Sequence, residues 1–72
     1  MPEFVVVSYP RVRDVFIDGR RSGETNQLLV IGEGEQEFDL GTPVDYQPRR
    51  RVVVVTGTTD NSPQRIRFTP AS

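Results

Sequence analysis

The chain has 72 residues, with nine arginines, no lysine, ten acidic residues and a formal net charge of -1, and it contains neither Cys nor His. This length indicates one thin-cored domain over residues 1–72, and the missing Cys and His exclude catalytic Ser-His or Cys-His pairs, disulfides and the common zinc sites. The balanced charge disfavours general nucleic-acid binding, and no apolar run is long enough to insert into a membrane or to form a signal peptide.

The first predicted strand covers residues 4–9 and is apolar at almost every position. Alternation places Phe4 and Val6 on one face and Val5, Val7 and Tyr9 on the other. A strand with two apolar faces needs cover on both sides, so this segment is either the first strand of the fold or an added one.

A second strand over residues 14–18 has Val15 and Ile17 on its inner face. It ends at Asp18-Gly19, and Gly19 and Gly23 are expected to bracket a tight turn, since glycine adopts positive φ without strain. A third strand is predicted over residues 25–31.

The second half of the chain predicts three more strands. Residues 35–40 place Gln36, Phe38 and Leu40 inward, and residues 64–69 place Ile66 and Phe68 inward. Between them lies a valine-rich strand over residues 49–56. The remaining segments are read as connections at 41–48 and 57–63 and as a frayed tail at 70–72.

No segment shows the apolar spacing of a helix, and turn residues recur every 8 to 12 positions. The sequence therefore predicts an all-β fold without helix. The predicted architecture is a small immunoglobulin-like β-sandwich of about six to seven short antiparallel strands.

Three motifs resemble the PEGA domain of bacterial proteins. They are Val15-x-Ile17-Asp18-Gly19-x-x-x-Gly23-x-Thr25, the Gly34-led strand over 35–40, and Tyr46-x-Pro48 before a valine-rich strand. The resemblance covers residues 12–69. It implies a small immunoglobulin-like sandwich that serves as a non-enzymatic accessory module, in surface or envelope proteins and beside kinase or receptor domains.

Three positions depart from the PEGA pattern: Asn26 replaces a preferred proline, Gln36 a frequent histidine and Asp45 a glycine. None of these removes an inward apolar residue, so the expected fold is unaffected. The chain as written predicts a cytoplasmic protein, whereas a segment excised from a longer PEGA-like protein would belong to an envelope or surface.

Acidic residues crowd the strand over 35–40 and the turn before it. Such carboxylates could form a glycosidase-like dyad or hold Ca²⁺. However, residues two apart on a strand share one solvent-facing side, and no calcium-loop spacing is present. We interpret them as a solvated acidic face and predict no catalytic residue, cofactor or metal.

The triplet Arg49, Arg50 and Arg51 admits two interpretations. It could bind an anion, such as nucleic acid or an acidic glycan, through guanidinium forks. Alternatively, Glu37 or Asp39 meets Arg49 or Arg51 across an antiparallel ladder.

The last predicted feature is a contact surface on the two most apolar strands. Phe4 and Val6 lie on the second face of the first strand, and the valine-rich strand contributes Val52, Val53, Val54 and Val55. A partner protein or a second copy of the chain would cover these side chains. The alternative is ordinary core packing with one or two exposed valines.

Overall fold

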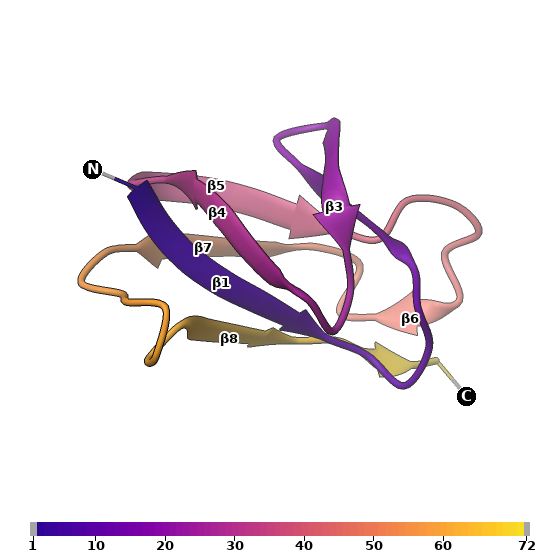
Figure 1. Ribbon diagram of the computed structural model, residues 1–72. Coiled ribbons are helices and arrows are strands. Elements are labelled where there is room, and N and C mark those ends of the chain that lie inside the picture. The colour runs from indigo at the N-terminus through magenta and orange to yellow at the C-terminus, as the bar shows by residue number, and fades with distance from the viewer. Residues whose placement is uncertain (1, 72) are drawn as a thin grey trace.

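A computed structural model describes residues 2–71, and over this range the chain forms strands and no helix (Figure 1). The described residues thus contain no helix that could cross a membrane. The all-β prediction is confirmed. The strands are β1 (Pro2–Ser8), β2 (Asp14–Ile17), β3 (Arg20–Glu24), β4 (Leu28–Gly32), β5 (Gly34–Asp39), β6 (Tyr46–Gln47), β7 (Arg51–Val55), β8 (Gln64–Arg67) and β9 (Thr69–Pro70).

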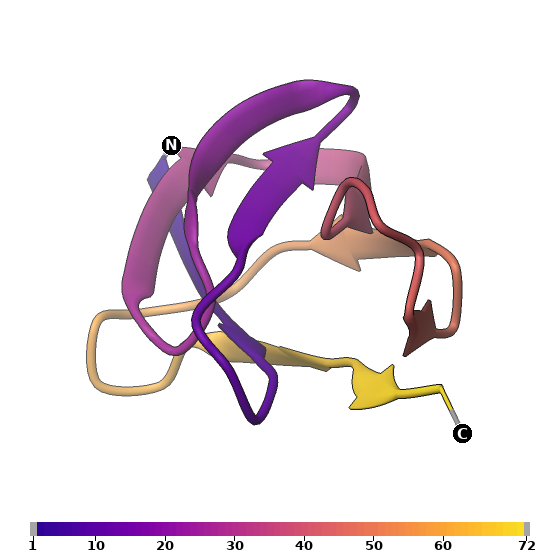
Figure 2. The same cartoon turned by 90° about the vertical axis from the view of Figure 1, so that its right-hand side faces the viewer.

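Two sheets pack face to face around one core. Sheet A has the strand order β4-β1-β8 and sheet B the order β3-β2-β5-β7, while β6 and β9 pair separately at one end. Figure 2 looks along the layers, with β1 and β4 on the left and β5 and β7 on the right. The outer faces of the two sheets therefore point in opposite directions.

The inner faces carry the apolar residues that alternation predicts. Val15 and Ile17 are buried in sheet B, and so is Phe38. The complete buried apolar set is Val5, Val7, Tyr9, Val15, Ile17, Leu29, Phe38, Leu40, Tyr46, Val55, Ile66 and Phe68.

The first strand occupies the centre of sheet A. β1 pairs with β4 in antiparallel register, with Val5 opposite Leu29, and with β8 in parallel register, with Val7 opposite Ile66. The parallel β1–β8 pair differs from the expectation that all strands are antiparallel. It arises because the chain passes from sheet B to sheet A between β7 and β8, instead of returning through a hairpin.

The hairpin of β2 and β3 is tighter than predicted. Asp18 and Gly19 have φ values of 52° and 83°, the two positive values that a two-residue hairpin turn requires. The turn therefore ends at Gly19. The segment expected to be a turn up to Gly23 is strand β3, which pairs with β2 through a bulge beside Val15.

The expected tail is also corrected. Pro70 lies in β9 opposite Tyr46, and the amide of Ala71 donates to the carbonyl of Asp45 at 2.9 Å. Backbone pairing therefore fixes Pro70 and Ala71 to the connection that follows β5. Ser72, the last residue of that predicted tail, lies outside the described residues.

Candidate functional site

The outer face of sheet A carries four apolar side chains, which we call the β1/β4 patch. Phe4 lies opposite Val30, and Val6 opposite Leu28. Phe4 and Val6 are half-buried, whereas Leu28 is 46% and Val30 62% exposed. Directly opposed residues share one face of a sheet, so the four form one continuous apolar strip. The predicted second face of the first strand thus exists, and β4 widens it.

Two arginines of β8 border this patch. Arg65 lies opposite Val6 and Arg67 opposite Ser8, and both side chains are exposed. Neither forms an ion pair within residues 2–71. The outer face of sheet A is therefore apolar over β4 and β1 and positively charged along β8.

The outer face of sheet B has a second strip, the β5/β7 patch of Glu35, Glu37, Val52 and Val54. Val52 lies opposite Glu37 and Val54 opposite Glu35. The two valines are 60% and 61% exposed. Two of the four predicted contact valines thus face solvent.

The other two valines of β7 point into the protein. Val55 is completely buried and Val53 packs against the core. The prediction of Val53 and Val55 as direct contacts is corrected, because a strand directs successive side chains to opposite faces.

The side chains of the arginine triplet do not all lie on one face of sheet B. Nη1 of Arg50 lies 3.1 Å from Oε1 of Glu37, whereas Arg51 lies opposite the buried Phe38. The predicted ladder of β5 with β7 is present, but the partner of Glu37 is Arg50 and not Arg49 or Arg51. Arg49 and Arg50 line a cleft of about 170 Å³.

The acidic residues of β5 and of the turn before it do not gather into a metal site. Asp39 accepts a hydrogen bond from the amide of Gly41 at 2.8 Å, and Glu33 accepts one from the hydroxyl of Thr56 at 2.8 Å. Within residues 2–71 no three acidic side chains converge on a point that could hold a metal ion.

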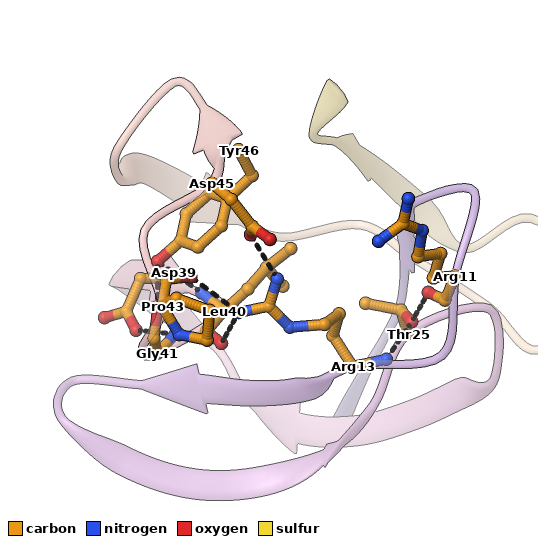
Figure 3. A network of polar contacts seen from close by, with 9 residues as sticks. All are labelled: Arg11, Arg13, Thr25, Asp39, Leu40, Gly41, Pro43, Asp45 and Tyr46. Atoms are coloured by element: carbon orange, nitrogen blue, oxygen red, sulfur yellow. Dashed lines mark hydrogen bonds and ion pairs between the residues drawn. The ribbon is translucent and has the colours of Figure 1, made fainter. Parts of the chain in front are cut away.

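Sequence reasoning missed the most elaborate polar cluster, which is centred on Arg13 (Figure 3). Nη1 of Arg13 lies 2.6 Å from Oδ1 of Asp45, and Nη2 donates to the carbonyls of Leu40 at 3.2 Å and Pro43 at 2.9 Å. The guanidinium also lies 5.3 Å from the ring centre of Tyr46. No sequence pattern marks these partners, since two of them are backbone carbonyls distant in the chain.

Thr25 and Tyr46 complete this cluster. The Thr25 hydroxyl donates to the carbonyl of Arg11 at 2.7 Å and accepts from the amide of Arg13 at 2.9 Å. The Tyr46 hydroxyl donates to the carbonyl of Gly41 at 2.9 Å, as in the tyrosine corner of immunoglobulin-like sandwiches. Because the chain itself supplies these partners, we interpret the cluster as one that fastens connections together.

A second fastening joins β1 to the β7–β8 loop. The carboxylate of Glu3 accepts hydrogen bonds from the amide of Thr58 at 2.8 Å and from its hydroxyl at 2.6 Å. The Thr58 hydroxyl in turn accepts from the amide of Phe4 at 2.7 Å. Hydrogen bonds from Thr58 lower the pKa of Glu3, and the hydrogen bond from Arg13 lowers the pKa of Asp45.

Comparison of the chain with protein-family models, with curated proteins and with solved structures gave no match. The two outer faces are therefore interpreted from their own chemistry.

Proposed function

We propose that this chain is a non-enzymatic structural or protein-interaction module that binds another protein, or a second copy of itself, through its outer sheet faces. The observation that carries the proposal is the pair of exposed apolar strips. Leu28 and Val30 face solvent on sheet A, and Val52 and Val54 face solvent on sheet B. β-branched and leucine side chains gathered on a sheet face favour burial against a partner.

The hydrogen bonding of the buried polar side chains supports a non-catalytic role. Every buried side-chain nitrogen or oxygen within residues 2–71 has a hydrogen-bond partner. Catalytic sites instead direct polar groups with perturbed pKa values into a cleft. The two groups with a lowered pKa, Glu3 and Asp45, are held by Thr58 and Arg13 of the chain itself.

The resemblance to PEGA domains fits this proposal. Such a module would lie beside other domains, and the contact faces would then bind a neighbouring domain or protein. The Tyr46 hydroxyl bonded to the carbonyl of Gly41 is a device of sandwiches of the immunoglobulin type, the architecture that the resemblance implies.

The anion-binding alternative through Arg49, Arg50 and Arg51 has weaker support. The guanidinium of Arg50 is paired with Glu37, and Arg51 lies on the side of the buried Phe38. An anion-binding domain would require several free guanidinium groups on one face, together with binding to DNA or heparin that weakens steeply with salt.

A binding experiment tests the proposed function. The immobilised chain is incubated with a cell extract, and in parallel with purified chain, and the retained proteins are quantified by mass spectrometry. We expect Val30→Glu or Val54→Glu to reduce retention at least about tenfold, equivalent to about 1.4 kcal/mol. Val12→Glu is the matched control, because Val12 is 65% exposed but lies in the link before β2.

Circular dichroism of each variant verifies that the fold is intact. The proposal requires a retained protein, which can be a second copy of the chain, that binds the wild type and Val12→Glu but is lost with Val30→Glu or Val54→Glu. If no such protein is found, the proposal fails.

A further inference from the structure

The two outer faces have opposite charge beside their apolar strips. On sheet A the apolar column of β1 is next to Arg65 and Arg67 of β8. On sheet B the exposed valines of β7 are next to Glu35 and Glu37 of β5. Glu37 is already paired with Arg50 of its own chain, whereas Glu35 forms no ion pair within residues 2–71. Both charged columns consist of residues two apart on one strand, so their spacing is the same, about 7 Å.

Resting on the proposed function, we infer that the partner is a second copy of this chain, bound head to tail. The β1/β4 patch with Arg65 and Arg67 of one copy would face the β5/β7 patch of the next. Apolar side chains would then meet apolar side chains, and guanidinium groups would meet carboxylates. Such charge complementarity selects partner and orientation.

The position of the two faces makes this association open-ended. They lie on opposite sides of the sandwich (Figures 1 and 2), so one copy can use both at the same time. A head-to-tail contact between different faces produces a ring or a filament, whereas a contact between identical faces closes as a pair.

Repulsion between like charges disfavours a dimer in which two copies bind through the same face. Two β5/β7 patches placed together would bring the Glu35 carboxylates of both copies close to one another, together with the Glu37 carboxylates, whose charge Arg50 of the same chain offsets in part. Two sheet A faces would do the same for Arg65 and Arg67. Like charges in contact oppose association, and such repulsion is a common source of specificity.

The size of the faces predicts a weak contact. Three strands about 4.8 Å apart give a face roughly 15 Å wide, which is smaller than the faces of standard stable complexes. We therefore expect association in the range of about 10 μM to 1 mM. It should weaken as salt screens the charged columns.

Sedimentation velocity over this concentration range provides the test. We expect the wild-type mass to rise well above the 8.2 kDa of one chain. Val30→Glu and Val54→Glu each damage one face, so each variant alone should remain monomeric. An equimolar mixture retains one intact face of each kind, so it should form a dimer of twice the chain mass. Val12→Glu should associate like the wild type.

A charge exchange provides a second, independent readout. Arg65→Glu with Arg67→Glu, or Glu35→Arg with Glu37→Arg, should each abolish association. All four substitutions in one chain should restore it, because the columns are again opposite in sign. Circular dichroism confirms the fold of each variant.

Three results would overturn the head-to-tail arrangement. The first is a wild-type chain that stays monomeric. The second is self-association of Val30→Glu or Val54→Glu when it is measured alone. The third is an equimolar mixture of these two variants that stays monomeric. If the wild-type chain is monomeric but retains a different protein through Val54, this inference fails while the proposed function stands.

Discussion

The guanidinium of Arg13 binds three groups of a single connection, residues 40–45, which is distant from Arg13 in sequence. It binds the carboxylate of Asp45 and the carbonyls of Leu40 and Pro43, and its side chain is only 16% exposed. Hydrogen bonds from a charged donor in such a position are among the stronger ones in proteins. Arg13 therefore holds the connection after β5 against the link that precedes β2.

Replacing this residue should destabilise the fold. We expect Arg13→Ala to lower the free energy of unfolding by about 2 kcal/mol, because two backbone carbonyls lose a charged donor. Urea denaturation followed by circular dichroism measures the change. Arg11→Ala is the control, since the Arg11 side chain is exposed and should contribute less than about 0.5 kcal/mol. Equal losses in both variants would contradict this role of Arg13.

Glu3 and Asp45 make the stability depend on pH. Both have a folded-state pKa below their ordinary values of 4.5 and 3.8, so unfolding takes up protons in acid. Their stabilisation is therefore complete above these ordinary values and is lost as the pH falls through the folded-state pKa values. Urea midpoints measured from pH 7 to pH 3 should decrease accordingly.

The matched variants are Glu3→Gln and Asp45→Asn, which should each flatten this decrease. Asp60→Asn is the matched control for the loss of one surface carboxylate, because no hydrogen bond to the Asp60 carboxylate is formed within residues 2–71. A wild-type midpoint that stays constant down to pH 3 would refute the assignment.

At the scale of the elements, Gly41 fixes how the chain leaves β5. Its φ is +71°, and a Cβ atom there would lie 2.6 Å from Cε1 of Phe16. Gly57 has a similar φ of +70° with open space around it. An alanine at position 57 would therefore introduce backbone strain alone, whereas an alanine at position 41 would add a steric collision with Phe16.

We expect Gly57→Ala to cost about 1 kcal/mol of unfolding free energy, from the left-handed backbone alone. Gly41→Ala should cost about 2 kcal/mol or more, because the ring of Phe16 must also move. Thermal denaturation of the two variants measures the difference. If they melt at the same temperature, the contact between Gly41 and Phe16 is not restrictive.

The alternation of apolar and polar residues predicted most strands, because every second residue of a strand faces the core. Val15 and Ile17, and likewise Ile66 and Phe68, are buried as expected. β3 was missed because Arg20, Arg21 and Ser22 have no apolar alternation. Its strand structure comes from backbone pairing with β2, and such pairing leaves no trace in side-chain polarity.

The candidate site was predictable only in part. The run of four valines indicated a second apolar face, but the pairing of β5 with β7 was needed to assign Val52 and Val54 to the outside. Leu28 and Val30 joined Phe4 and Val6 only once β4 was placed beside β1. The position of Arg65 likewise depends on the parallel pairing of β8, which local sequence does not encode.

At the scale of the whole molecule, the central position of β1 determines when the protein can fold during synthesis. Of the strands described here β1 is synthesised first, yet one of its partners in sheet A is β8, with Ser8 opposite Arg67. Pairing of such distant segments is slow, because a long loop must close first. The edge of β1 that pairs with β8 therefore stays unpaired until β8 has been synthesised. Until then the apolar strands are accessible to aggregation or to chaperone binding.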